Sequence, residues 1–219
     1  MIEHCYNNTK SALGAENTYI ATCDEEIKDY MQSIGANVVM TSNSHTGATT
    51  RTAEALGIIE NKSKDSFEII VMVQGDEPMI NEIMIDQALK PMLKDNNIYV
   101  TNLLGKIKSK EELNNKNKIK VVCDQYSYAL YFSRSPIPDK ITNYPFYGKQ
   151  VCVIPFEKNF LFEYSSMKET QLEISESIDM LRILENGKKV YMAKTEYNNQ
   201  SVDTLEELDI VNSLLNKND

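Results

Sequence analysis

The chain has 219 residues, a net charge of −9, and ordinary hydrophobic and charged contents of 42% and 25%. This length supports one sizeable core, and the acidity argues against a nucleic-acid partner, because a phosphate backbone requires a basic face. No apolar run approaches the ~18 residues of a membrane-spanning helix. We therefore expect a cytoplasmic protein that contacts neither nucleic acid nor membrane.

The four cysteines are Cys5, Cys23, Cys123 and Cys152, and no two of them form a C-x-x-C pair. Cys123 and Cys152 lie within apolar runs. These features predict buried, reduced thiols and no zinc site. No second histidine or cysteine lies near His45 in the sequence, so we do not predict it to be a metal ligand or a general base.

In chain order, the front half alternates helices with short strands. The expected elements are helix 1–13, strand 17–22, helix 24–34, strand 37–41, helix 53–59 and strand 67–73. Asp24 and Gly35 are placed as the N-cap and the terminal glycine of the second helix. The alternation predicts an α/β fold with a doubly wound, mostly parallel sheet.

The second half departs from this alternation. We expect helix 80–93 with a break near Pro91, strand 98–104, a polar connection at 109–118, strands 119–123, 128–132 and 149–156, helix 170–185, strand 189–193 and helix 204–215. Thr204 and Glu207 have the spacing of a capping box. The successive strands predict a small inserted β-lobe at about 118–156 within a single domain, 1–219.

The strongest predicted strand, 67–73, runs into Gln74-Gly75-Asp76-Glu77-Pro78. Sites in α/β folds form at the carboxyl ends of strands. Asp76 is therefore either a turn residue or a ligand of a charged group, and both interpretations stay open at this point. No G-x-G-x-x-G and no G-x-x-x-x-G-K-[ST] motif occurs, so neither a Rossmann dehydrogenase nor a P-loop NTPase is supported.

Seven stretches, in their order and spacing, resemble one known family. They are MIEHC, YIATCDEEI, VVMTSNSHTGATTRTAEAL, IVMVQGDEPMI, IKVVCDQYSYALYFSRSPIP, ESIDMLRILENG and SVDTLEEL. The chain resembles the 3-deoxy-manno-octulosonate (Kdo) cytidylyltransferases, also called CMP-Kdo synthetases. The resemblance covers nearly the whole chain, and V-Q-G-D-E-P and A-L-Y-F-S-R-S-P-I-P are its most specific motifs.

The resemblance implies a reaction in lipopolysaccharide biosynthesis. The anomeric hydroxyl of an acidic 3-deoxy-ulosonic sugar attacks the α-phosphate of CTP, and pyrophosphate leaves. Nucleophile and phosphate are both negatively charged, so such a reaction requires Mg²⁺ and cationic donors. The resemblance also implies a homodimer.

The resemblance gives a role to each candidate residue. Asp76 and Asp203 match the catalytic residues that bind the metal. The residues matched to nucleotide binding are Gly47, Ala48, Thr49 and Arg51, and those matched to sugar binding are Gln74, Arg134, Gln150 and Asp179. From the residues alone, Asp203 could equally be an acid favoured by the helix dipole, and Gln74 a strand-end cap.

Arginine is scarce in this chain, and its positions are informative. Of 23 basic residues only Arg51, Arg134 and Arg182 are arginine, and all three lie in matched segments. A bidentate fork to carboxylate or phosphate would explain why lysine does not replace them. For Arg182 the alternative is a structural salt bridge with Asp179 or Glu185.

The chain also departs from the family pattern. In the family, a strand and a loop of the form A-R-x-x-S-x-R-x-P-x-K precede the position where this sequence begins. We therefore expect the triphosphate-binding loop and the central strand to be absent, which leaves a catalytically inactive binding or assembly module as the alternative hypothesis.

Other departures concern single positions. The family's S-G-T-E-R is GATTR in this chain, ending at Arg51. Gln150 stands where the family has a histidine that faces the sugar. Met180 stands where the family has a glutamine, and Cys23 replaces the last residue of the family's A-T-D. Nucleotide transfer can survive these changes. They leave the sugar open between Kdo, an amino- or otherwise modified ulosonic acid, and a different acidic sugar.

Overall fold

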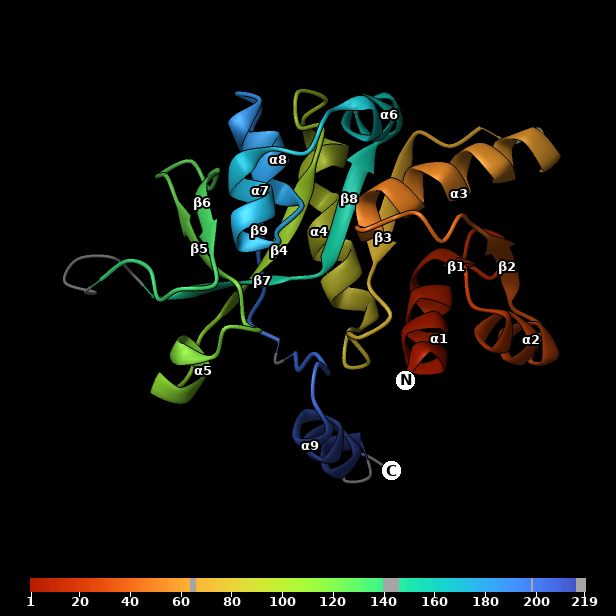
Figure 1. Ribbon diagram of the computed structural model, residues 1–219, viewed down its shortest axis with the longest axis horizontal. Helices are drawn as coiled ribbons and strands as arrows, with labels where there is room; N and C mark the ends of the chain where they lie inside the picture. The colour runs from red at the N-terminus through yellow and green to blue at the C-terminus, as the bar shows by residue number, and fades with distance from the viewer. Residues whose placement is uncertain (64–65, 140–145, 198, 216–219) are drawn as a thin grey trace. The chain divides into compact units, whose positions relative to one another are not determined.

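The computed structural model describes residues 1–63, 66–139, 146–197 and 199–215 (Figure 1). The chain divides into two compact units. The first comprises Met1–Glu68, Met72–Asp86 and Asn198–Asp219, and the second comprises Ile69–Val71 and Gln87–Tyr197. Within the described ranges, every helix is too short or too polar to cross a membrane.

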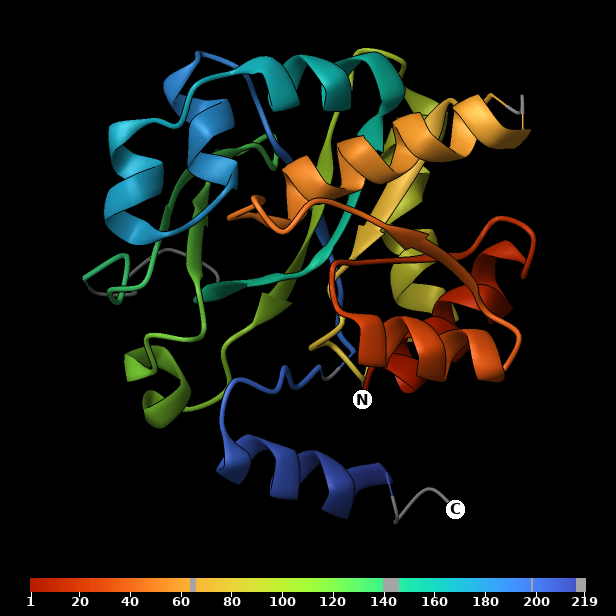
Figure 2. The same cartoon turned by 45° about the vertical axis from the view of Figure 1, so that its right-hand side comes forward.

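The first unit places helices around a parallel pair of strands. Its elements are α1 (Ile2–Leu13), β1 (Tyr19–Thr22), α2 (Glu25–Ser33), β2 (Asn37–Met40), α3 (Ala48–Ser63) and α9 (Leu205–Leu215), while β3 (Ile69–Val73) and α4 (Glu82–Lys94) have residues in both units. β1 pairs with β2 in parallel, with Tyr19 opposite Asn37. α2 packs against both strands (Figure 2). The predicted strand–helix alternation is confirmed here.

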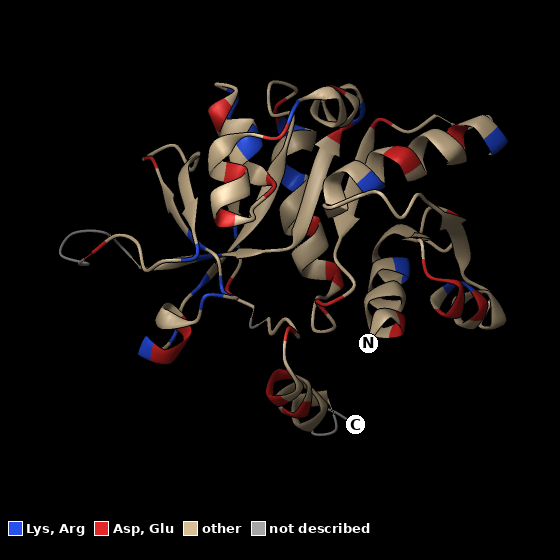
Figure 3. Cartoon of the chain, viewed as in Figure 1, with Lys and Arg blue, Asp and Glu red and all other residues tan. Residues whose placement is uncertain are grey.

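A small apolar cluster holds α1, β1 and α2 together. Tyr6, Ile20, Met31 and Ala36 are buried in one contiguous group. Asp24 caps α2 by accepting a first-turn backbone N–H at 3.0 Å, as the sequence predicts. The first turn of α9 is acidic, and Figure 3 colours its acidic residues red along the ribbon.

The second unit is built on a mixed five-stranded sheet in the order β6-β5-β7-β4-β9. Its elements are β4 (Thr101–Lys106), α5 (Lys110–Asn114), β5 (Lys120–Cys123), β6 (Ala129–Ser133), β7 (Gly148–Val151), β8 (Val153–Glu157), α6 (Lys158–Ser166), α7 (Gln171–Glu176), α8 (Met180–Glu185) and β9 (Tyr191–Lys194). β4 pairs with β9 in parallel, and the β4–β7, β5–β6 and β5–β7 pairs are antiparallel. The strands of the predicted lobe thus continue the same sheet through β7 and β4.

Four elements differ from the sequence-based expectation. The predicted break near Pro91 is wrong, because α4 continues from Glu82 to Lys94 with Pro91 inside it. The predicted strand 149–156 is two strands, β7 and β8, which are separated at Cys152. The predicted helix 170–185 is two helices, because Ser177 at the end of α7 adopts a left-handed conformation with φ of 53°. The polar connection 109–118 contains the short helix α5, which Ser109 caps by accepting the Glu112 N–H at 3.1 Å.

The cysteines all lie within the described residues, and none forms a disulfide. Cys5 is buried, but Cys23 is exposed, and Cys123 and Cys152 are partly exposed. The prediction of buried thiols is therefore wrong for three of the four. Cys123 lies in β5, where alternate residues face opposite sides of the sheet, so a position within an apolar run does not guarantee burial.

Candidate active site

The first predicted site lies in the turn after β3, at residues 74–78. The backbone fixes this turn, because the Glu77 N–H donates to the Gln74 carbonyl and the Ile80 N–H donates to the Glu77 carbonyl, each at 3.3 Å. Asp76 is half-buried, whereas Glu77 is only 2% exposed. Two adjacent carboxylates at the strand's end therefore have different environments.

A backbone hydrogen bond brings the second predicted metal ligand to this turn. The Val202 N–H donates to the Asp76 carbonyl at 2.9 Å, so Asp203 lies one residue from the contact. The Asp203 side chain is exposed, and its backbone N–H donates to Glu207 Oε2 at 2.7 Å. Glu207 also accepts the Thr204 N–H and donates its own N–H to Thr204 Oγ1, each at 3.2 Å, which confirms the predicted capping box.

The chemistry of this pair fits a hard divalent cation. Mg²⁺ takes oxygen ligands, often only one or two protein carboxylates, and completes its shell with water and substrate phosphates. Within the described ranges, no group of three or more His, Cys, Asp or Glu side chains could hold a metal ion. A magnesium site here would therefore use Asp76 and Asp203 together with oxygens of the substrate.

Cys5 on α1 also contacts this turn, and the sequence did not indicate it. Its Sγ donates to the Gly75 carbonyl at 3.4 Å. Burial raises the pKa of Cys5 to about 11, and the nearby Glu77 and Asp76 carboxylates add to the rise. The thiol therefore stays protonated at neutral pH and serves as a hydrogen-bond donor. It does not act as a metal ligand or a nucleophile, because both roles require a thiolate.

The predicted nucleotide-binding residues lie together at the N-terminus of α3: Gly47, Ala48, Thr49 and Arg51. Arg51 Nη1 donates to Thr41 Oγ1 at 2.6 Å and to the Ser42 carbonyl at 3.2 Å. Of the five N–H donors of the guanidinium, the three on Nε and Nη2 have no acceptor among the described residues. Such donors beside the first backbone amides of a long helix suit phosphate oxygens.

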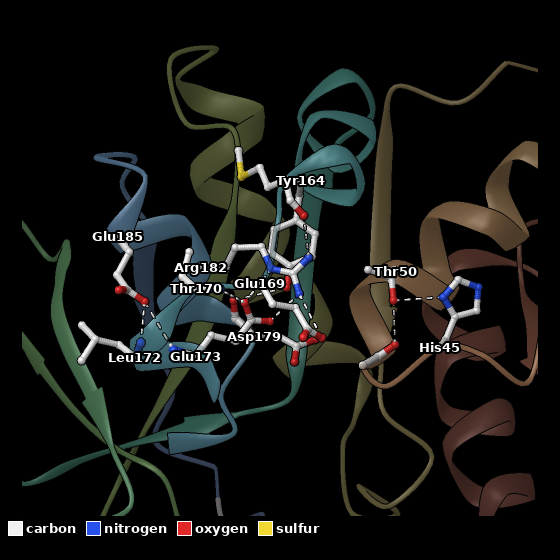
Figure 4. A network of polar contacts seen from close by, with 12 residues as sticks. His45, Thr50, Tyr164, Glu169, Thr170, Leu172, Glu173, Asp179, Arg182 and Glu185 are labelled. Atoms are coloured by element: carbon white, nitrogen blue, oxygen red, sulfur yellow. Dashed lines mark hydrogen bonds and ion pairs between the residues drawn. The ribbon is translucent and has the colours of Figure 1, made fainter. Parts of the chain in front are cut away.

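His45 ties the preceding loop to α3. Its Nδ1 lies 3.1 Å from Thr50 Oγ1, a contact that Figure 4 shows, and its Nε2 contacts Glu54 Oε2. Glu54 accepts a hydrogen bond from the Ser42 N–H at 2.9 Å. This hydrogen bond lowers the pKa of the Glu54 carboxyl, and the contact with His45 lowers it further. Glu54 is thus an anion that orders the loop before Arg51.

In the second unit, three backbone carbonyls hold the Arg134 guanidinium. Nε donates to Glu176 O at 2.6 Å, Nη1 to Lys116 O at 3.0 Å and Nη2 to Ser177 O at 3.1 Å. The Glu176 carboxylate accepts the Arg134 backbone N–H at 2.9 Å. Among the described residues, one N–H stays available on each terminal nitrogen, a pair that suits a carboxylate. Asp179, the residue before α8, accepts a hydrogen bond from the Tyr164 hydroxyl through its backbone carbonyl at 3.3 Å.

Gln150 on β7 is oriented by a residue that no sequence pattern singled out. Asn102 is fully buried, and its Nδ2 donates to the carbonyls of Val151 at 2.7 Å and Leu103 at 3.2 Å. Its Oδ1 is therefore an acceptor and binds Gln150 Nε2 at 2.7 Å. This contact leaves Gln150 with a carbonyl oxygen, an acceptor, as its other polar atom.

Arg182 is held in a buried structural network (Figure 4). Its Nε and Nη2 bind the two carboxylate oxygens of Glu173 at 2.7 and 2.5 Å, and its guanidinium lies 4.6 Å from the centroid of the Tyr164 ring. Arg182 and Glu173 are 5% and 7% exposed. Glu173 is a partner that the sequence did not name, because it becomes adjacent only when helix 170–185 breaks into α7 and α8.

Comparisons with known proteins show the family to which the chain belongs. A family model described as cytidylyltransferase matches residues 1–190. The chain is 36% identical to the 3-deoxy-manno-octulosonate cytidylyltransferase of Fusobacterium nucleatum subsp. nucleatum, over 100% of this chain and 87% of that protein. It is 38% identical to the protein of the same name from Trichlorobacter lovleyi, over 95% of this chain and 85% of that protein. The chain belongs to the Kdo cytidylyltransferase family.

Solved structures agree with this membership. A CMP:2-keto-3-deoxy-manno-octonic acid synthetase complexed with CTP superposes with a TM-score of 0.86 at 30% identity, over 99% of this chain and 88% of that chain. This match confirms the predicted α/β fold class. The 4-diphosphocytidyl-2C-methyl-D-erythritol synthase of Anaerococcus prevotii, with a TM-score of 0.63 and 14% identity, shares the fold alone.

Proposed function

We propose that this member of the Kdo cytidylyltransferase family transfers CMP from CTP to the anomeric hydroxyl of an acidic 3-deoxy-ulosonic sugar and releases pyrophosphate. The observation that carries the proposal is the Val202–Asp76 hydrogen bond, which brings Asp203 to the turn that carries Asp76. The relatives at 36% and 38% identity are named for this reaction.

The reaction joins two anionic molecules. The sugar oxygen forms a bond to the α-phosphorus of CTP, the bond from that phosphorus to the β-phosphate oxygen breaks, and the hydroxyl proton passes to solvent. Bound Mg²⁺ would neutralise phosphate charge and make the attacking hydroxyl more acidic. In our proposal Asp76 and Asp203 hold that cation, and the three remaining N–H donors of Arg51 contact phosphate oxygens.

In our proposal the sugar is recognised by both hydrogen-bond donors and hydrogen-bond acceptors. Arg134 offers one N–H from each terminal nitrogen to the sugar carboxylate. Gln150 offers a carbonyl oxygen, which accepts a hydrogen bond from a hydroxyl or an ammonium group of the sugar. Asp179, which belongs to the second unit like Arg134 and Gln150, supplies a further hydrogen bond. This acceptor at Gln150 is compatible with Kdo and with an amino-substituted ulosonic acid.

We also propose that the enzyme acts as a cytoplasmic homodimer in lipopolysaccharide biosynthesis. The lobe at 118–156 carries exposed apolar side chains, with Tyr126 70% and Leu130 62% exposed, and a second copy of the chain would cover them. Sedimentation equilibrium of the wild-type chain and of Leu130→Glu tests this assembly, and a wild-type monomer at micromolar concentration would contradict it.

Pyrophosphate release from CTP, Mg²⁺ and Kdo tests the activity. The wild-type chain is assayed beside its Asp76→Asn variant. Release by the wild-type chain with Kdo is the expected result. Release only with another ulosonic acid changes the sugar and keeps the chemistry. No release with any sugar of a panel would favour the inactive binding or assembly module.

A further inference from the structure

Glu77 is a buried carboxylate that the proposed chemistry does not use. Its residue is 2% exposed, although it lies in a turn and directly follows Asp76. A carboxylate loses much hydration free energy on burial and needs polar partners in the fold. A turn residue without a further role could point its side chain into water, so the inward orientation of Glu77 requires a reason.

One partner of Glu77 comes from a distant part of the sequence. Asn199 Nδ2 donates to Glu77 Oε2 at 3.1 Å, across 122 residues of sequence, and Asn199 is 4% exposed. Both residues belong to the first unit. This buried hydrogen bond therefore joins the turn after β3 to the start of the segment that leads into α9.

The segment 199–203 is held at three successive points. Glu77 holds its first residue, the Asp76 carbonyl accepts the Val202 N–H at 2.9 Å, and Glu207 Oε2 accepts the Asp203 N–H at 2.7 Å. These contacts fix the backbone and leave the Asp203 side chain exposed. The anchored segment thus presents one carboxylate beside the turn that presents the other.

We propose that Glu77 is a positioning residue of the cytidylyltransferase reaction: through Asn199 it aligns the segment 199–203 with the turn 74–78, so that Asp76 and Asp203 can share one divalent cation. The inference rests on the proposed function. A neutral glutamine at position 77 would accept the same hydrogen bond from Asn199, so alignment of the segment does not require a charge. In our proposal the negative charge of Glu77 has a second effect. It adds to the negative potential of a site that attracts a cation, within the short range over which such charges act.

The test combines cation binding with backbone protection. Glu77→Ala, Glu77→Gln, Asn199→Ala and the double Ala variant are compared with Glu206→Ala, which removes an exposed carboxylate in the first turn of α9. Mn²⁺ affinity in the presence of CTP is measured by electron paramagnetic resonance, and amide exchange of the peptide that contains 199–203 by mass spectrometry. Thermal unfolding identifies any variant that fails to fold.

We expect Glu77→Ala and Asn199→Ala each to weaken Mn²⁺ binding about tenfold, the usual effect of losing a residue that orients a metal ligand. The double variant should be little worse than either single variant, because both remove the same hydrogen bond. Exchange of 199–203 should rise in all three, while Glu77→Gln keeps the protection and loses part of the affinity. Glu206→Ala should leave both measurements unchanged.

Two results separate the failure of the inference from the failure of the proposed function. Wild-type affinity and protection in a folded Glu77→Ala variant would overturn the positioning role, and wild-type affinity in a folded Glu77→Gln variant would overturn the effect of the charge. Absence of Mn²⁺ binding by the wild-type chain in the presence of CTP would instead overturn the proposed function, and with it the metal-positioning role.

Discussion

The backbone N–H of Val202 lies 2.9 Å from the carbonyl oxygen of Asp76. These residues come from two segments that the first unit takes from distant parts of the sequence, Met72–Asp86 and Asn198–Asp219. Main-chain atoms make the contact, so it does not depend on either aspartate side chain. The fold can therefore bring the turn that carries Asp76 and the segment that carries Asp203 together through main-chain atoms alone.

This arrangement predicts that Asp76→Asn and Asp203→Asn each reduce pyrophosphate release by at least about 100-fold, since a charged oxygen that holds the cation supplies several kcal/mol of transition-state stabilisation. The melting temperature should change little, because the backbone contact survives. Asp209→Asn, an exposed position on α9, is the control. Near-normal turnover in either variant would remove that residue from the metal site.

Local signals in the sequence predicted much of the first unit. The N-cap at Asp24 and the capping box of Thr204 and Glu207 depend on residues a few positions apart, and both are confirmed. The turn after β3 was recognisable because an apolar strand runs into Gly75, Asp76 and Pro78. Short-range stereochemistry accounts for these features, so a single sequence is sufficient to find them.

Tertiary relationships were not accessible in the same way. No glycine or proline announces the break at Ser177, and without that break the pairing of Arg182 with Glu173 cannot be inferred. Asn199 and Asn102 show no pattern, because each acts through a partner on another element. Glu77 had one signal, its position beside Asp76, but its inward orientation is a property of the fold.

Arg51→Lys tests the nucleotide role of the guanidinium. Lysine keeps the positive charge but has no planar fork, so it cannot bind phosphate oxygens while it also contacts Thr41 and Ser42. A hydrogen bond to a charged group contributes about 1.5–3 kcal/mol, so the KM for CTP should rise about tenfold or more. Arg134→Lys is the matched variant and should raise the KM for the sugar instead. Equal effects of both variants on both substrates would contradict the assignment.

The Arg182–Glu173 pair predicts a large effect on stability without a specific effect on substrate binding. Arg182→Met leaves a buried carboxylate without its partner, which costs about 3–5 kcal/mol in the free energy of unfolding. Arg182→Met with Glu173→Leu should be less destabilised, because no unpaired charge stays behind. Urea denaturation measures both. Glu169→Gln is the control: its side chain is 52% exposed and 4.0 Å from Arg182, so it should change stability by less than about 1 kcal/mol. A small loss in Arg182→Met would contradict the predicted cost.

Lys120 predicts a distinct pH dependence. Its side chain is fully buried, and its Nζ donates to the carbonyls of Asn115 at 2.9 Å and Lys118 at 2.6 Å. Burial lowers the pKa of Lys120 to about 8, with repulsion from Arg134 adding to the shift and attraction to Glu176 opposing it. The folded state therefore binds this proton less tightly than the unfolded chain does.

A base with a lowered pKa makes the unfolded state the better proton acceptor between the two pKa values. The free energy of unfolding that Lys120 contributes should rise as the pH increases from about 8 to the ordinary lysine value of 10.5, and it should be lost again as the pH falls through 8. Other groups titrate in this range, so the measured quantity is the difference between wild type and Lys120→Met in urea denaturation at pH 7, 8.5 and 10. The stability of the wild type relative to Lys120→Met should increase with pH. Lys168→Met replaces an exposed lysine, so its stability relative to the wild type should not change with pH. A difference that does not change with pH would show that the Lys120 ammonium is as stable in the fold as in water.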